Sequence, residues 1–306
     1  MNVSPPWFAI FGHDGGSLPP HDALAAWNFD LFIVVPLVVV GLLYRRGWRH
    51  AHDGSAQAYA MLAALATIVI SLLSPIDAIG GILLSAHMVQ HVLLIAVAAP
   101  LFAWAAPGAA LLRGTPVPIR RRFVDARRRS GLDAGVISQM RSPVARWLLF
   151  IAALWLWHSS VLYDLAIENN AAHALEHVSF LGAAVLFWTV ILGPVRARLE
   201  HGAAILAVFT LTLQGIVLSM LMTFSRIVWY EPYAVAAPGW NLDPLADQQL
   251  AGVIMWVPTG FIHTGILLAI LLRWLHSIDH PGSNRRSSGT RSFGTVSPPP
   301  DTQVTN

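Results

Sequence analysis

Two pairs of histidines in this sequence have the same spacing, His87 with His91 and His173 with His177. Residues four positions apart on an α-helix lie on the same side of it, separated by about 6 Å along its axis. Two imidazoles at this distance can bind one metal ion, as they do in helical zinc motifs. One such pair is a weak indication of a metal site, and two pairs together with His158 are a stronger one.

The chain has no cysteine, so any metal would be held by His, Met, Asp or Glu side chains. Imidazole suits copper, zinc and iron, whereas the thioether of methionine favours Cu(I). Besides the five histidines, the residues that could support such a site are Met88, Glu176, Asp247 and Met255. Glu176 would orient an imidazole as a hydrogen-bond acceptor. Asp247 would either cap its own helix or face the histidines.

Each of these residues also has a purely structural interpretation. A single histidine inside a membrane helix can simply form a hydrogen bond with a neighbouring helix, and methionines commonly fill gaps in a core. We expect His263, which is separate from the other histidines, to form such a bond. The metal interpretation is favoured only when all five histidines are taken together.

The elements that must position these histidines are transmembrane helices. Hydrophobic residues make up 55% of the chain and charged residues 11%, whereas soluble domains carry about 25% charged residues. A helix that crosses the ~30 Å hydrocarbon layer needs roughly 20 apolar residues. The sequence therefore predicts an all-α, polytopic bundle of about seven transmembrane helices, near 28–44, 57–74, 82–104, 144–162, 171–193, 203–224 and 250–273.

Arginine indicates the orientation of this bundle, because positively charged loops stay in the cytoplasm. Eighteen of the 19 arginines fall in alternate connecting segments, and only Arg226 falls elsewhere. The N-terminus is therefore expected outside and the C-terminus in the cytoplasm. We expect an extracytoplasmic segment at 1–27, the membrane domain at 28–274 and a disordered cytoplasmic tail at 275–306.

This orientation gathers the histidines in one layer. The third predicted helix begins at the outer side, the fourth ends there and the fifth begins there, which gives all five histidines a similar depth. The arginines are explained by orientation, so the net charge of +3 does not indicate a nucleic-acid partner. The absence of lysine excludes a retinal Schiff base.

A set of short stretches between residues 80 and 260 is specific in combination. These stretches are His87–Leu94, Ala99–Leu101, Trp157–His158, Leu162–Asp164, His173–His177, Leu186–Trp188, Asp247–Gly252 and Ile254–Trp256. Together they resemble the CtaG family of integral-membrane cytochrome c oxidase assembly factors. Two positions depart from the family pattern, since Val92 and Ser160 stand where methionine and proline are common. The first departure removes one possible soft ligand.

The resemblance implies a role in maturing a haem–copper oxidase in a bacterial inner membrane, with the oxidase subunits and membrane lipid as partners. We interpret the histidines as an extracytoplasmic copper site that assists metal delivery to the oxidase. Two alternatives stay open, a bis-histidine haem protein and an ion or proton transporter that uses the histidines as relays. The sequence contains no evident nucleophile–base pair or phosphate-binding loop, so we do not expect an enzyme.

Overall fold

The computed structural model describes residues 20–49, 54–129, 142–194 and 198–279. Within these ranges every regular element is a helix and there is no β-strand. The helices are α1 (Leu31–Trp48), α2 (Ser55–Leu73), α3 (Pro75–Gly80), α4 (Leu84–Val92), a π-helix (Leu93–Ala98), α5 (Ala99–Ala105), α6 (Gly108–Gly114), α7 (Val117–Arg129), α9 (Pro143–Trp157), α10 (Ser160–Glu168), α11 (Asn170–Leu192), α12 (His201–Thr223), α13 (Glu231–Ala236) and α14 (Pro244–Asp279), with short 3₁₀ turns at Ala23–Ala25 and Ala237–Trp240.

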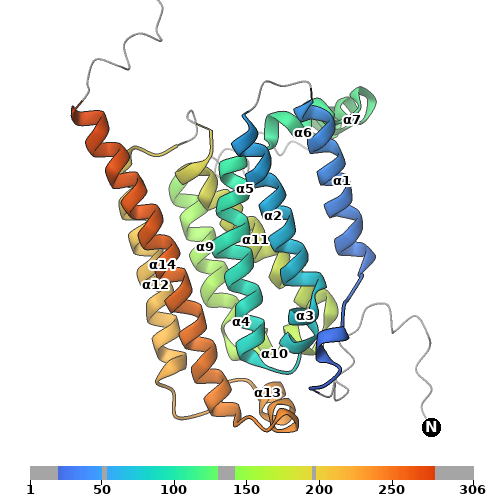
Figure 1. Cartoon of the computed structure of the whole chain (residues 1–306), viewed down its shortest axis with the longest axis vertical. Helices are drawn as coiled ribbons and strands as arrows, with labels where there is room; N and C mark the ends of the chain where they lie inside the picture. Colours follow the sequence, from blue (N-terminus) through green and yellow to red (C-terminus); the bar gives the residue numbers. More distant parts are fainter. Residues whose placement is uncertain (1–19, 50–53, 130–141, 195–197, 280–306) are drawn as a thin grey trace, which may run out of the picture.

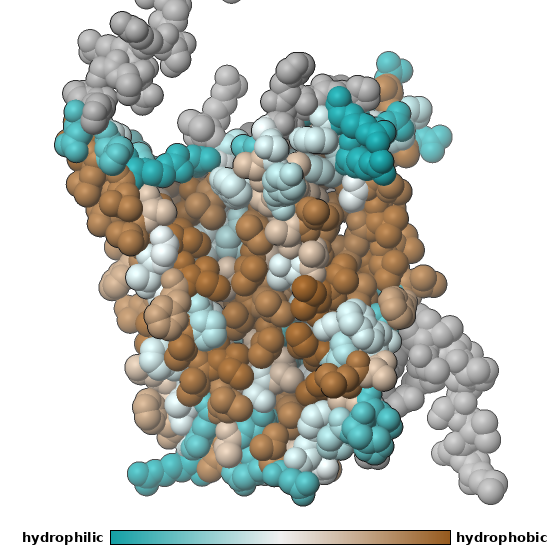
Figure 2. All heavy atoms as spheres, viewed as in Figure 1, coloured by the Kyte–Doolittle hydropathy of each residue, from teal (hydrophilic) through white to brown (hydrophobic). Residues whose placement is uncertain are grey.

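Six spans in the described residues are long and apolar enough to cross a membrane, and there are seven if the bent pair α9 and α10 counts as one. One of these spans is continuous through α4, the π-helix and α5. Figure 2 shows hydrophobic side chains across the middle of the visible face and hydrophilic ones at both ends. The predicted all-α bundle of about seven membrane helices is therefore confirmed.

The fourth span is shorter than the sequence predicts. The prediction was a helix over 144–162, but the chain bends by 75° between α9 and α10. Two side chains at the bend donate hydrogen bonds to carbonyl groups of the last turn of α9. The ring of His158 donates from Nδ1 to the Leu154 carbonyl at 2.8 Å, and the Ser159 hydroxyl donates to the Leu156 carbonyl at 2.6 Å. Such local hydrogen bonds compete with continuation of the helix, and α10 lies across the end of the bundle (Figure 1).

The two ends of the bundle differ in composition. The C-terminal ends of α1 and α14 lie at the same end as α6 and α7, whereas α3, α10 and α13 lie at the other (Figure 1). The last turns of α1 and α6 carry Arg45, Arg46 and Arg113. The histidine pairs instead belong to α4 and to the first half of α11, and both helices begin at the opposite end. We call these the arginine end and the histidine end.

The start of α4 is capped by a residue from a distant helix. Leu83, which precedes α4, has no side chain that can bond the first N–H groups. Asp247 of α14, buried and 163 positions further along the chain, accepts hydrogen bonds from the backbone N–H of Leu84 at 2.7 Å and of Ser85 at 3.3 Å. A carboxylate at this place also complements the helix dipole. Asp247 therefore acts as a cap, but for α4 rather than for its own helix.

The opposite side of α4 is bonded to α2 and α3. The Gln90 side chain donates to the Ser71 carbonyl at 3.0 Å and to the Asp77 carboxylate at 2.8 Å. The Ser71 hydroxyl returns a bond to the Gln90 carbonyl at 3.1 Å. Because Gln90 lies between the two histidines in sequence but bonds α2 and α3, it fixes the rotation of α4 about its axis.

The π-helix follows directly after the histidine pair of α4. In a π-turn the carbonyl of Ile95 would accept from residue 100, which is a proline and has no N–H. The indole N–H of Trp188 on α11 donates to this carbonyl instead, at 3.1 Å. The side chain of a neighbouring helix thus satisfies the carbonyl that the irregular turn leaves without a backbone partner.

Helices α12 and α14 approach each other closely at Gly252. A Cβ atom at this position would lie 2.4 Å from the Thr223 hydroxyl and 2.7 Å from the Ser219 carbonyl. Close approach of this kind requires a residue without a side chain. The contact places the first turns of α14, with Asp247, against the end of α12.

The ends of the chain lie largely outside the described residues. Helix α14 continues to Asp279, beyond the predicted domain boundary at 274. The rest of the predicted tail, 280–306, and most of the predicted outer segment 1–27 are not described, so their predicted character stays a prediction.

The cap of α4 makes a testable contribution to stability. Asp247→Asn removes a buried charge that accepts several hydrogen bonds, so we expect it to lower the unfolding free energy by about 1–3 kcal/mol. The measurement is the thermal midpoint of the detergent-purified protein. Asp243→Asn is the control, because Asp243 is exposed and accepts from the Ala246 N–H at 2.9 Å. Equal effects of the two variants would contradict the importance of the cap.

Candidate metal centre

Four of the candidate residues come together at the histidine end of the bundle. One ligand atom from each of His87, His91, Glu176 and His177 lies within 4.8 Å of the others. Two come from α4 and two from α11, and all four are buried. The four-residue spacing places both imidazoles of α4 on the side that faces α11. We call these residues the four-ligand cluster.

The distances within the four-ligand cluster suit a metal ion. The Nε2 atoms of His87 and His91 are 2.9 Å apart. The carboxylate oxygens of Glu176 lie 3.7 Å from the first and 3.6 Å from the second. Donor atoms bound tetrahedrally at about 2.0–2.1 Å from an ion are roughly 3.3 Å from one another. The separations among His87, His91 and Glu176 are therefore close to those of ligands that share one ion.

The carboxylate of Glu176 is the most unusual group in this cluster. Its side chain is completely buried, and neither oxygen accepts a hydrogen bond from any residue that the structure describes. Leaving a buried acceptor without a donor costs about 1–3 kcal/mol, and more for a charged group. A bound cation would supply the missing partner.

A tyrosine of α13, between α12 and α14, orients His87. The Tyr233 hydroxyl donates to the Gly80 carbonyl at 2.8 Å and lies 3.3 Å from His87 Nδ1. Burial raises the pKa of Tyr233 well above its ordinary value, so the group stays a neutral phenol. Because its only proton is given to Gly80, the hydroxyl accepts from Nδ1–H of His87. The lone pair of that imidazole is then on Nε2, directed into the four-ligand cluster.

Two of the five predicted histidines lie beside the four-ligand cluster. The ring centre of His173 is 5.3 Å from that of His87 and 4.4 Å from that of His177. The ring centre of His158 is 6.2 Å from that of His91. Both rings are close to the cluster, but neither belongs to the group of four.

The supporting candidates have different environments. Glu176 is a member of the four-ligand cluster rather than only an acceptor for an imidazole. The carboxylate of Asp247 is bonded to the start of α4. Met88 is fully buried among apolar and tyrosine side chains, which suits a core residue. Met255 lines a cavity next to the four-ligand cluster, and His91 and His158 line the same cavity.

Sequence reasoning missed the aromatic cover of the site. Tyr230 donates to the His158 carbonyl at 3.0 Å, and its ring centre is 4.1 Å from that of Tyr163. The only signal for it in the sequence is the concentration of aromatic residues between α12 and α14, with Trp229, Tyr230, Tyr233 and Trp240. The separate prediction for His263 is confirmed, since its Nδ1 and the Thr212 hydroxyl of α12 are 2.8 Å apart.

Comparison with known proteins gives one family and several distant relatives. The family model described as cytochrome c oxidase caa3 assembly factor (Caa3_CtaG) matches residues 37–277. Uncharacterized proteins of Mycobacterium bovis (Mb0105) and Mycobacterium tuberculosis (MT0111) are each 26% identical over 280 residues, covering 88% of this chain and 42% of the relative. An uncharacterized protein of Mycobacterium leprae (ML1998) is 24% identical over 273 residues, covering 83% of this chain and 40% of its own length. The chain thus spans about two fifths of these relatives, and no solved structure matches it significantly.

The Glu176 carboxylate, which accepts no hydrogen bond from the described residues, allows a test that does not depend on metal. In metal-free protein we expect Glu176→Gln to raise the unfolding free energy by about 1 kcal/mol or more, because Glu176 must either bury a charge without a hydrogen bond or take up a proton on folding, whereas glutamine is neutral in both states. The measurement is the thermal midpoint in detergent with a chelator present. Asp247→Asn is the matched variant, since its carboxylate is buried at the same end but bonded, and it should lower the midpoint. A fall in both variants would indicate that Glu176 has a structural role.

Proposed function

The chain belongs to the Caa3_CtaG family of cytochrome c oxidase caa3 assembly factors, and on this basis we propose that it binds copper at the four-ligand cluster and assists its delivery to a haem–copper oxidase. The observation that carries the proposal is the convergence of three imidazoles and one unbonded carboxylate within 4.8 Å. Copper is here a cargo, so the cluster has to bind the ion and also release it.

The donor set supports copper as the ion. Imidazole nitrogen suits copper, zinc and iron, and a single carboxylate adds a negative charge that favours a cation. An oxidase of the haem–copper class needs copper in its active centre, so the donor chemistry and the family agree. The Tyr233 contact supports the same reading, because it leaves His87 Nε2 free of a proton. A metal-binding imidazole needs that form.

The same geometry favours copper over haem at this cluster. Bis-histidine haem requires two imidazoles on opposite faces of a flat macrocycle. His87 and His91 come from one helix, and their Nε2 atoms are 2.9 Å apart. Ligand atoms of His177 and Glu176 lie within 4.8 Å of those of His87 and His91. A porphyrin has no room between these groups, whereas a single ion does.

Arginine supports an orientation in which the four-ligand cluster faces away from the cytoplasm of a bacterial inner membrane. The arginine end carries basic residues on α1 and α6, and the histidine end is the opposite one. Positive residues near membrane helices stay in the cytoplasm. The four-ligand cluster would then bind copper at the outer side of the membrane and pass it to oxidase subunits at the same side.

Copper binding is tested with the full-length protein, purified in detergent and stripped with a chelator. We expect one equivalent of Cu(II) with an electron paramagnetic resonance spectrum that shows nitrogen couplings from imidazole. His87→Ala combined with His91→Ala should abolish this binding, because half of the donors are removed. In cells, the double variant should fail to restore oxidase activity to a deletion strain.

The control for this experiment is His201→Ala combined with His276→Ala. These two histidines belong to the first turn of α12 and the last turn of α14, away from the histidine end. This variant should bind copper as the unchanged protein does. Unchanged binding in the His87 and His91 double variant would contradict the proposed site.

Orientation is tested with a reporter enzyme that is active only outside the cytoplasm. Fused after Asn169, between α10 and α11, the reporter should be active; fused after Asp279, at the end of α14, it should be inactive. The reverse pattern would place the four-ligand cluster on the cytoplasmic side and contradict delivery from the outer face.

A further inference from the structure

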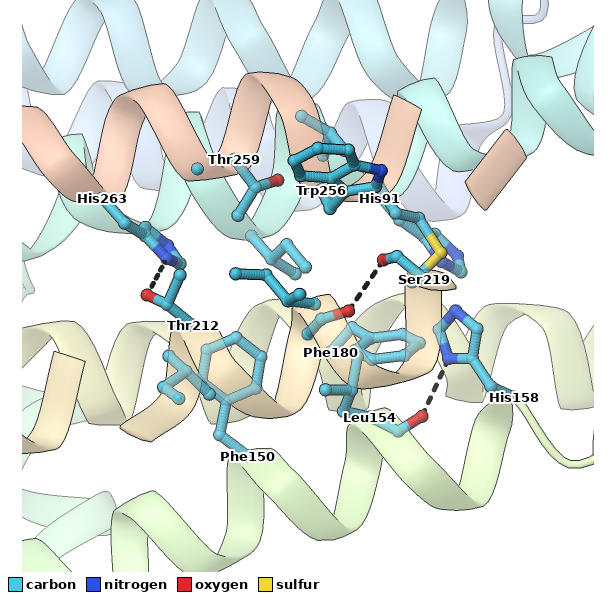
Figure 3. A pocket seen from close by; sticks show the side chains of 17 residues that line it. His91, Phe150, Leu154, His158, Phe180, Thr212, Ser219, Trp256, Thr259 and His263 are labelled. Carbon is cyan, nitrogen blue, oxygen red and sulfur yellow. Dashed lines mark hydrogen bonds between the residues drawn. The ribbon is translucent and has the colours of Figure 1, made fainter. Parts of the chain in front are cut away.

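A narrow cavity adjoins the four-ligand cluster. It lies between α4, α9, α11, α12 and α14 and has a volume of about 50 Å³, with His91 and His158 at one end and His263 at the other (Figure 3). Such a volume holds roughly three or four water-sized groups, or an ion with its donors. His91 belongs to the four-ligand cluster and also lines the cavity, so its side chain separates the two.

His158 offers a donor atom to this cavity. Its Nδ1 is 2.8 Å from the Leu154 carbonyl and must donate to it, because a carbonyl only accepts. The lone pair of the neutral ring is therefore on Nε2. This atom is buried and has no hydrogen-bond partner among the residues that the structure describes. Such an atom carries a desolvation cost that a bound cation would offset.

His91 also has a ring nitrogen without a hydrogen bond in the described chain. Its Nε2 is in the four-ligand cluster, whereas Nδ1 is buried and forms no hydrogen bond within the described chain. A metal-bound histidine usually donates its other N–H to an acceptor, and none is provided here. The ring of His91 stands at 73° to the ring of His158.

The rest of the cavity lining supports a soft ion. Met255 provides the only sulfur among the lining residues, and aromatic and aliphatic side chains such as Phe150 and Phe180 form much of the remaining surface. Thioether and imidazole donors in apolar surroundings select Cu(I), whereas hard divalent ions prefer oxygen ligands and water. No carboxylate lines this cavity.

We propose that His158 Nε2 and Met255 Sδ form a second cation position in this cavity, selective for a soft monovalent ion of the Cu(I) class. This inference rests on the proposed function, since the second position would exchange its ion with the four-ligand cluster across His91. The ion keeps its oxidation state in this step. Bonds to the donors of the cluster are replaced by bonds to His158 and Met255, and no electron is transferred.

The test is a titration of the full-length protein in detergent with Ag(I), a redox-inert substitute for Cu(I), and with Cu(I) against a chromophoric chelator. We expect two equivalents per chain in the unchanged protein. Met255→Leu and His158→Ala should each leave one equivalent. X-ray absorption of the Cu(I)-loaded protein should show a sulfur neighbour that is lost in Met255→Leu. Leucine is close to methionine in volume, so this variant is expected to keep its packing.

The matched control is Met222→Leu. Met222 is also buried, at the histidine end of α12, but it does not line the cavity. This variant should still bind two equivalents. Glu176→Gln combined with His177→Ala should lose the equivalent of the four-ligand cluster and retain the other.

The possible failures can be told apart. One equivalent in the unchanged protein, unaffected by Met255→Leu and His158→Ala, would overturn the second position and leave the four-ligand cluster standing. The unchanged protein could also bind one equivalent of the ion that is lost in Met255→Leu and His158→Ala but kept in Glu176→Gln combined with His177→Ala. That result would overturn the copper site proposed at the four-ligand cluster. Absence of any bound equivalent would overturn both.

Discussion

A carboxylate removed from water requires hydrogen-bond donors or a cation, and this requirement distinguishes two of the buried acidic residues at the histidine end, Asp247 and Glu176. Asp247 meets it with backbone N–H groups of α4. Glu176 does not meet it with any hydrogen bond inside the described chain and lies instead beside three imidazoles. Buried polar groups in folded proteins are bonded as a rule. Glu176 departs from this rule at both of its carboxylate oxygens, and the proposed copper site rests on this observation.

Several residues around the four-ligand cluster hold its helices and imidazoles in place through hydrogen bonds. Asp247 holds the start of α4, Gln90 fixes its rotation against α2 and α3, and Tyr233 sets the proton on His87. A metal site works best when its ligands are held by a second layer of hydrogen bonds. Here that layer comes from α2, α3, α13 and α14, so the imidazoles are positioned by much of the bundle and not by α4 alone.

The sequence predicts the parts of this site that depend on local periodicity. Apolar runs predict the spans, and four-residue spacing places each histidine pair on one helix face. His158 could not be placed in the same way, because the bend that follows α9 depends on side chains that bond carbonyls of its last turn. The Tyr233 contact with His87 joins residues 146 positions apart, and the Asp247 cap joins residues still further apart. Such pairings are set by packing, which hydropathy and spacing do not encode.

The π-helix divides the third span into two halves with independent registers. Each residue of an α-helix adds about 100° of rotation, and a π-turn absorbs one residue more than an α-turn would. Deletion of one residue from this turn would restore a regular helix and leave both halves on the same faces, whereas deletion of a second residue would rotate one half by about 100°. Either the histidines of α4 would leave α11, or the apolar residues of α5, among them Ala99 and Ala103, would leave the core. The span should therefore tolerate the loss of one residue at this turn but not of two, although its hydropathy would hardly change in either case.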